Sequence, residues 1–353
     1  MSRFKAKILG FLINVYRKFF RVPPEKINIA EINSVAIINN KRLGDFLFCT
    51  PSIRAIKDAN PNVKIIAVTS YGNKGLISDC PYIDDVMYMG DGTREAVEVG
   101  LKLRKLKPDL GIVFHSKSPF DLVAMTLSGA SCIMKHYFGN ERKILMSSYD
   151  DVVIGGFNPP VQNDLALVSK LQINTENMKM FYPSPMATKS PDGLSIGIQL
   201  GASGSDRFFP TDKAVKIVET ISREFPQCKF SLIGSGNELE LSADFFKLLN
   251  PAFSNKVADH VGKTTLQELA NLINNFSVLI TPDTGCLHIA TALQTKTVSL
   301  FTIKQQKASV PQQDPELHHV IFASEYCVDE AKHNLSSIPS EDIIAKVTKA
   351  IES

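Results

Sequence analysis

Several features that would place this chain of 353 residues in other protein classes are missing from it. It has no tryptophan, and its six cysteines are scattered without a CxxC or CxxH pair, which argues against a structural zinc site and a disulfide framework. Neither GxGxxG nor the P-loop pattern occurs, and Asp-x-Asp, the usual carboxylate clamp for a metal-bound nucleotide sugar, is absent. We therefore expect reduced thiols, a cytoplasmic protein and no metal site.

The composition is that of a globular protein, with 44% hydrophobic and 21% charged residues. A length of 353 residues suggests two domains. The net charge of +3 is too small to indicate a nucleic-acid-binding protein, so no nucleic acid is expected as a partner.

The excess positive charge lies at the N-terminus, where residues 1–21 carry six Lys or Arg and no acidic residue. At helical spacing five of the six cations share one sector with polar residues, and Phe, Leu, Ile and Val fill the remaining arc with Lys5 as the one exception. The apolar run at residues 8–16 is too short to span a bilayer. The pattern predicts a basic amphipathic helix, residues 1–24, that either docks on a membrane surface through residues 1–21 or packs on its own domain.

The body of the chain alternates between apolar strands and amphipathic helices, which predicts parallel sheets. The clearest linker, residues 183–193, is rich in turn-forming residues and interrupts this alternation. We expect two doubly wound α/β domains, residues 25–182 and 194–353, with ligands bound at the carboxyl ends of strands in the cleft between them. The predicted strands are 35–38, 64–69, 85–88, 110–114, 195–200, 229–233, 277–281 and 297–301, and the predicted helices are 45–60, 95–106, 211–225, 238–249, 265–274, 285–293 and 341–351, the last with Ser340 as N-cap.

The first loop whose side chains could bind a ligand or catalyse a reaction, residues 39–45, runs from a strand into a helix. Gly44 allows another molecule to approach the backbone, and Asp45 stands where the helix is expected to begin. Asp45 is therefore either an N-cap residue, a catalytic carboxylate, or both.

Two later loops suit an anionic ligand. Residues 201–210 combine glycines and hydroxyls with Arg207, so backbone N–H groups and the guanidinium could hold phosphate oxygens. Residues 281–288 lead into a helix. Asp283, Thr284 and Gly285, where the helix is expected to begin, are residue types typical of helix N-termini, and His288 is expected in the first turn.

Four segments occur in a specific order: Arg-Leu-Gly-Asp-Phe-Leu at 42–47 with Thr50-Pro51, Gly-Ala-Ser…Arg-Phe-Phe-Pro at 201–210, Gly-Ser-Gly-Asn-Glu at 234–238, and Pro-Asp-Thr-Gly-Cys-Leu-His at 282–288. Together they resemble the ADP-heptose:lipopolysaccharide heptosyltransferases, glycosyltransferase family 9. The resemblance implies a GT-B fold of two Rossmann-like domains and inverting transfer from ADP-heptose without a required metal. It also implies a lipid A–core acceptor at the cytoplasmic face of the inner membrane, where the enzyme is peripheral.

The resemblance also implies roles for individual residues. Asp45 would be the general base that deprotonates the acceptor hydroxyl. Lys41, Arg42 and Gly44 are expected on the acceptor side, together with the less diagnostic His115 and Lys117. The donor side would consist of a phosphate loop, a ribose-binding carboxylate and a helix N-terminus: Ser203, Arg207, Glu238, Asp283, Thr284, Gly285 and His288.

The chain departs from the family pattern at two positions, with Phe209 where Trp is common and Thr302 where Gly is usual. His260, His318, His319 and His333 are expected to be surface or structural residues. Three alternatives stay open: a GT-B transferase with another nucleotide sugar, a non-catalytic sugar-nucleotide-binding protein at a membrane, and a nicotinamide-dependent oxidoreductase, which the missing glycine fingerprint disfavours.

Overall fold

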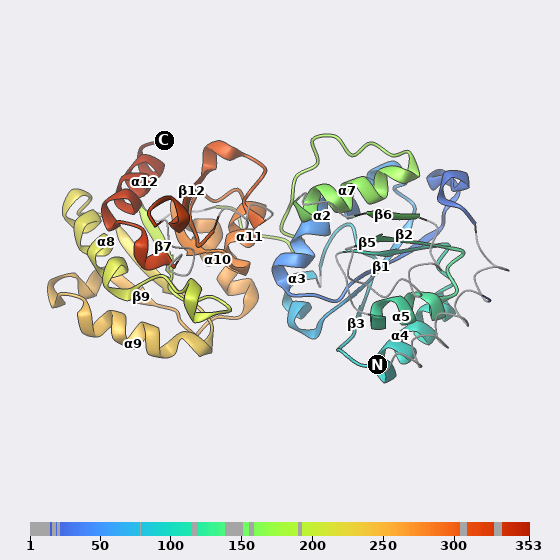
Figure 1. The fold of residues 1–353 in the computed structure, drawn as a ribbon, viewed down its shortest axis with the longest axis horizontal. Helices are drawn as coiled ribbons and strands as arrows, with labels where there is room; N and C mark the ends of the chain where they lie inside the picture. Colours follow the sequence, from blue (N-terminus) through green and yellow to red (C-terminus); the bar gives the residue numbers. More distant parts are fainter. Residues whose placement is uncertain are drawn as a thin grey trace. The chain divides into compact units, whose positions relative to one another are not determined.

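The computed structural model describes residues 22–77, 79–114, 119–137, 151–154, 159–189, 193–303, 309–327 and 334–353, together with Val15 and Phe19 (Figure 1). The chain divides into two compact units, Met1–Pro185 and Met186–Ser353. The boundary between them falls within residues 183–193, the expected linker. Of the predicted basic helix, residues 1–24, the first 21 residues lie outside the described residues apart from Val15 and Phe19.

The first unit contains a six-stranded sheet in the order β3-β2-β1-β4-β5-β6, and every strand pair is parallel. Helices α2 and α7 pack together on one face of this sheet, and α4 and α5 pack together on the other (Figure 1). The strands are β1 (Ser34–Asn39), β2 (Lys64–Thr69), β3 (Asp85–Tyr88), β4 (Leu110–Val113), β5 (Cys132–Tyr137) and β6 (Asp151–Ile154). The helices are α2 (Leu43–Ala59), α3 (Lys74–Ile77), α4 (Thr93–Leu106), α5 (Pro119–Ser128) and α7 (Pro160–Val168), with short 3-10 turns at Pro24–Lys26, Ile29–Glu31, Tyr71–Asn73 (η3) and Ser169–Leu171.

Helix α2, which begins beside the first loop, continues through Pro51 because a side chain compensates for the missing backbone donor. Proline has no N–H to donate to the carbonyl four residues earlier, that of Leu47. The Thr50 hydroxyl donates to this carbonyl instead, at 2.8 Å, and also accepts the Phe181 N–H at 3.2 Å. The Thr50-Pro51 pair therefore keeps the helix intact while joining it to a distant segment of the same unit.

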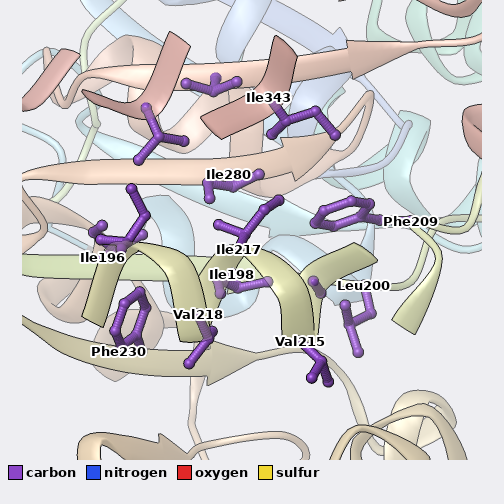
Figure 2. Close-up of a cluster of buried hydrophobic side chains, with 14 of the residues drawn as sticks. Ile196, Ile198, Leu200, Phe209, Val215, Ile217, Val218, Phe230, Ile280 and Ile343 are labelled. Carbon is purple, nitrogen blue, oxygen red and sulfur yellow. The ribbon is translucent and has the colours of Figure 1, made fainter. Parts of the chain in front are cut away.

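The second unit repeats the arrangement with a parallel sheet in the order β12-β11-β10-β7-β8-β9. Its largest core cluster lies between the sheet and helices α8, α9 and α12, where Ile196, Ile217 and Ile343 interdigitate with Phe209 and Phe230 (Figure 2). The strands are β7 (Ser195–Gln199), β8 (Lys229–Ile233), β9 (Val257–Asp259), β10 (Val278–Pro282), β11 (Thr297–Phe301) and β12 (His318–Phe322). The helices are α8 (Thr211–Glu224), α9 (Leu239–Leu248), α10 (Leu266–Asn275), α11 (Gly285–Ala292) and α12 (Ser340–Glu352), with 3-10 turns at Ser205–Arg207, Gly236–Glu238, Pro251–Lys256, Pro315–Leu317, Ala323–Glu325 and Leu335–Ser337.

The structure confirms every predicted strand to within a residue or two and corrects some helix starts. Ser340 is not the N-cap of the last helix, because the residue at that position is Pro339, without a side-chain cap, and Ser340 is already helical. The helix predicted at 238–249 begins instead as a 3-10 turn at Gly236–Glu238. Strands β5, β6, β9 and β12 and helices α3, α5 and α7 were not predicted.

Candidate functional site

Both sheets share the strand order of Rossmann-type folds, in which the direction of winding reverses between two neighbouring strands. These strands are β1 and β4 in the first unit and β7 and β10 in the second. Ligands of such sheets bind outside the carboxyl ends of the strands at this reversal. The loops after β1, β7 and β10, which contain predicted site residues, therefore lie where ligands are expected. His115 and Lys117, which follow β4, lie outside the described residues.

The loop after β7 is anchored at its far end and carries a cation at its centre. Phe209 is completely buried and its N–H donates to the Leu200 carbonyl at 2.8 Å, so the loop returns to the strand end. Between these anchors the Arg207 guanidinium donates to the Ser203 hydroxyl and lies 4.0 Å from the Asp283 carboxylate. The structure therefore brings together Ser203, Arg207 and Asp283, three of the residues expected on the donor side.

Helix α11 begins without a side-chain cap on its N–H groups. Thr284 occupies the N-cap position, but its hydroxyl donates to the Gln199 side-chain oxygen at 2.6 Å rather than capping the helix. The buried Thr281 hydroxyl donates to the same oxygen at 2.8 Å. Gln199 thus fixes the end of β10 against the end of β7, and the first N–H groups of α11, from Gly285 onward, receive no side-chain cap.

Burial changes the charge states of the two titratable groups at this helix. Burial lowers the pKa of His288 to about 4, so its imidazole is neutral near pH 7. Burial raises the pKa of Asp283, and the nearby Arg207 guanidinium opposes that shift. The contact of 3.9 Å between His288 Nε2 and Asp283 Oδ1 is consequently not an ion pair at neutral pH.

Glu238 joins the loops after β7 and β8. Its carboxylate accepts the Gly201 N–H at 3.1 Å and, in a capping box, the Ser235 N–H and hydroxyl at 3.1 Å each. A Cβ at Gly201 or Gly234 would lie within 2.5 Å of this side chain, so a larger residue at either position would require Glu238 to move. Glu238 also contributes to the raised pKa of Cys286, after burial, which places its charge near the start of α11.

The first unit places Asp45 in the first turn of α2, two residues after the helix begins at Leu43. The interpretation of Asp45 as the N-cap is therefore wrong, because Leu43 and Gly44 are already helical and Arg42 is at the cap position. The Asp45 carbonyl accepts the side-chain amide of the completely buried Asn39 at 2.7 Å. This hydrogen bond ties the first turn of the helix to the last residue of β1.

The predicted acceptor-side residues lie in the same loop. Gly44 is buried, Lys41 is half-buried and Arg42 is exposed. The Lys41 carbonyl accepts the Ser70 hydroxyl at 2.8 Å and the Asn73 amide at 3.0 Å, so the segment after β2 holds the loop in place.

A buried acidic residue on α7, which the sequence analysis missed, lies near Asp45. Asp164 is 1% exposed, and its Oδ1 atom is 3.9 Å from Nε2 of the completely buried His136 at the end of β5. Burial, followed by the charge of Asp45, raises the pKa of Asp164 well above its usual range. Asp45 thus lies close enough to a buried carboxyl group to raise its pKa, and shifted pKa values of this kind are common at catalytic sites.

In the part of the chain that the structure describes, no cluster of three or more His, Cys, Asp or Glu side chains could hold a metal ion. Within the same part, no helix has both the length and the apolar character needed to cross a membrane.

Comparisons with known proteins give the same result as the motifs. The sequence model described as glycosyltransferase family 9 (heptosyltransferase) matches residues 161–334. The chain is a glycosyltransferase that is similar to family 9. A lipooligosaccharide heptosyltransferase 2 of Campylobacter jejuni is 23% identical over 318 residues, which cover 87% of this chain and 96% of the relative.

Solved structures show the same GT-B fold. The family 9 glycosyltransferase of Veillonella parvula superposes with a TM-score of 0.79 and 16% identity, covering 93% of this chain and 99% of its own. The ADP-heptose lipopolysaccharide heptosyltransferase II of Escherichia coli gives a TM-score of 0.73 and 18% identity, covering 90% and 98%. This glycosyltransferase therefore has two Rossmann-like domains.

The family match at residues 161–334 includes every predicted donor-side residue but not Asp45. Gln199 was missed because a polar residue at the end of an apolar strand was not considered a candidate site residue. Asn39 has the same position on β1, and a polar residue at the last position of a switch-point strand would have been the signal for both.

Proposed function

We propose that this glycosyltransferase moves heptose from ADP-heptose to a hydroxyl of the lipopolysaccharide or lipooligosaccharide inner core, with inversion and without a metal. The observation that carries the proposal is Arg207, held by Ser203 and Asp283 beside the uncapped start of α11. A guanidinium and a helix N-terminus together suit the diphosphate of a nucleotide sugar. The names of the C. jejuni and E. coli relatives supply the sugar and the acceptor class.

In the proposed reaction, the acceptor oxygen forms a bond to the anomeric carbon of the heptose, and the bond from that carbon to the diphosphate breaks. Asp45 takes the proton of the acceptor hydroxyl, and ADP leaves with the bonding electron pair. Arg207 and the α11 N–H groups stabilise the negative charge that develops on the diphosphate. Asp283, Thr284, Gly285 and His288 line the diphosphate and sugar side.

We further propose that the Glu238 carboxylate accepts hydrogen bonds from the ribose hydroxyls. It already accepts three hydrogen bonds from protein groups, so its orientation is fixed before the ligand arrives. A carboxylate has about four lone-pair sites, so one stays open, and a second ribose hydroxyl would have to replace one of the protein donors. On the acceptor side, the proposal assigns Lys41, Arg42, Gly44, His115 and Lys117.

The test is a transfer assay with ADP-heptose and a heptose-free core acceptor in excess EDTA, with the anomeric configuration of the product determined by NMR. We expect transfer with inversion, at a rate that EDTA does not change. Transfer from a UDP- or GDP-sugar but not from ADP-heptose would keep the fold and reject the donor. Loss of transfer in EDTA that added Mg²⁺ restores would reject metal independence.

Residues 1–21, with six cations and no acid, are proposed to dock the enzyme on the anionic cytoplasmic face of the inner membrane. Deleting them is expected to release the protein from vesicles that contain anionic lipid. Unchanged vesicle binding of the truncated protein would overturn this part of the proposal.

A further inference from the structure

Two tyrosines stack at the carboxyl edge of the first sheet. Tyr71 is the first residue of η3, directly after β2, and Tyr88 is the last residue of β3. Their ring centroids are 5.9 Å apart and their planes are inclined by 26°. Tyr71 is 61% exposed, so the pair presents a large aromatic surface to solvent. Tyrosine rings combine an apolar face with a polar tip and suit ligands that have both characters.

The pair lies close to the candidate base. In the register of the sheet, Asn39, Thr69 and Tyr88 are level with one another on the adjacent strands β1, β2 and β3. Neighbouring strands are about 4.8 Å apart, which places the Tyr88 backbone about 10 Å from that of Asn39. Because Asn39 donates to the Asp45 carbonyl, the tyrosines and Asp45 share one edge of the sheet, at a separation that a short oligosaccharide spans.

Cationic residues belong to the segments next to the pair. The Lys41 carbonyl is held by Ser70 and Asn73, the residues on either side of the dipeptide that begins with Tyr71. Arg42 follows Lys41, and both Arg42 and Lys74 are exposed, whereas Asp91 is an exposed acid after β3. An aromatic surface with cationic residues in the adjoining segments is suited to a saccharide that carries phosphate or carboxylate groups.

We propose that Tyr71 and Tyr88 form an acceptor subsite that stacks against a sugar ring of an anionic oligosaccharide, whose charged substituents lie against Lys41 and Arg42. The inference rests on the proposed function, since it concerns the substrate that receives the sugar. It assigns Tyr71 to binding and not to the chemical step. A purely structural role, in which Tyr71 only covers Tyr88 on the edge strand, predicts a loss of stability without a change in acceptor affinity.

The absence of tryptophan allows a direct binding experiment. Tyr71→Trp keeps an aromatic ring and makes it the single tryptophan of the full-length protein. Titration with a deacylated, heptose-free core oligosaccharide, without donor, is expected to change its emission in a saturable way. Tyr326→Trp, at a 39% exposed position in the second unit, is the matched control and is expected not to respond. No response at position 71 in a variant that still transfers sugar would overturn the subsite.

Steady-state kinetics supply the second measurement. Tyr71→Ala is expected to raise the acceptor KM at least tenfold and to leave the donor KM within twofold, and Tyr71→Phe to stay close to wild type. A melting curve for each variant separates this effect from unfolding. If neither the wild type nor the Tyr71→Trp variant transfers heptose, but the variant shows a saturable emission change, the proposed reaction is rejected and the subsite is kept. An unchanged acceptor KM in a folded Tyr71→Ala variant would reject the subsite alone.

Discussion

The two units have the same strand order but carry opposite chemistry at their carboxyl edges. The second unit presents glycines, hydroxyls, Arg207 and a helix N-terminus without a side-chain cap, all suited to an anion. The first unit presents Asp45 near a buried carboxyl, that of Asp164 next to His136, whose pKa is raised by burial and by the charge of Asp45. The same scaffold thus carries two different sets of side chains, because the loops at the strand ends differ while the sheets are alike.

The contrast extends to how each site is held. In the second unit, the side chains of Gln199 and Glu238 join neighbouring loops through hydrogen bonds. In the first unit, the Asn39 side chain joins β1 to the first turn of α2 through a hydrogen bond. Burial, followed by the charge of Asp45, raises the pKa of the Asp164 carboxyl. Donor binding and proton transfer are therefore expected to fail separately under mutation.

The largest effect is expected from Asp45→Ala. Loss of the positioned base is expected to lower kcat about 10²–10⁴-fold, because an acceptor hydroxyl is a poor nucleophile while it keeps its proton. Affinity for ADP is expected to stay within twofold, measured by titration calorimetry. Asp58→Ala, an exposed carboxylate at the other end of the same helix, is the control. A fully active Asp45→Ala enzyme would remove the first unit from the chemistry.

Arg207→Ala is expected to have the next largest effect, about 10²–10³-fold in kcat/KM, because the leaving diphosphate loses a preorganised cation. Arg207→Lys keeps the charge but loses the fork that contacts both Ser203 and Asp283, so partial activity is expected. ADP affinity must fall together with activity. If ADP binds to Arg207→Ala as it does to the wild type, the assignment of the phosphate loop is wrong.

The pH dependence of stability is expected to differ in sign between the units. His288 and His318 have folded-state pKa values lowered to about 4 by burial, so the second unit loses stability as pH falls from 6.5 to 4, by roughly 3 kcal/mol for each histidine. The raised pKa of Asp283 offsets part of this loss. Asp164, whose pKa is also raised, makes the first unit more stable as pH falls toward the unfolded-state value.

Hydrogen exchange at pH 7 and pH 5, resolved by unit, measures this difference. His288→Gln is expected to reduce the pH dependence of the second unit and to leave that of the first unchanged. Equal slopes in the two units would contradict the burial-based charge states.

The smallest effect is expected from Gly201→Ala. The added Cβ would lie 2.4 Å from the Glu238 carboxyl carbon, so this side chain must move, at about 1–3 kcal/mol of stability and with weaker ADP binding. Gly236→Ala in the next loop is the matched control, since no atom lies within 4 Å of its added Cβ. Equal melting temperatures for the two variants would show that the contact between Glu238 and Gly201 is not constrained.

The sequence predicted the repeated α/β alternation and the donor-side cluster because both leave local patterns: apolar strands, and glycine-rich loops that precede helices. It missed β5 and α7, whose buried polar residues Lys135, His136 and Asp164 interrupt the apolar pattern. It also missed the pairing of Gln199 with Thr281 and Thr284, because these contacts depend on which strands are neighbours in the sheet. Contacts of this kind follow from topology and not from spacing along the chain.

The proposal that the second unit binds the donor and the first unit takes the proton can be tested in one thermal-shift experiment. It uses ADP, UDP, GDP and NAD, without metal, on the wild type, Asp45→Ala and Arg207→Ala. At about 100 times its dissociation constant, a ligand that binds the folded state stabilises it by roughly 2.7 kcal/mol. We expect selective stabilisation by ADP in the wild type and in Asp45→Ala, and its loss in Arg207→Ala. Stabilisation that disappears in Asp45→Ala but persists in Arg207→Ala would contradict the assignment of donor binding to the second unit.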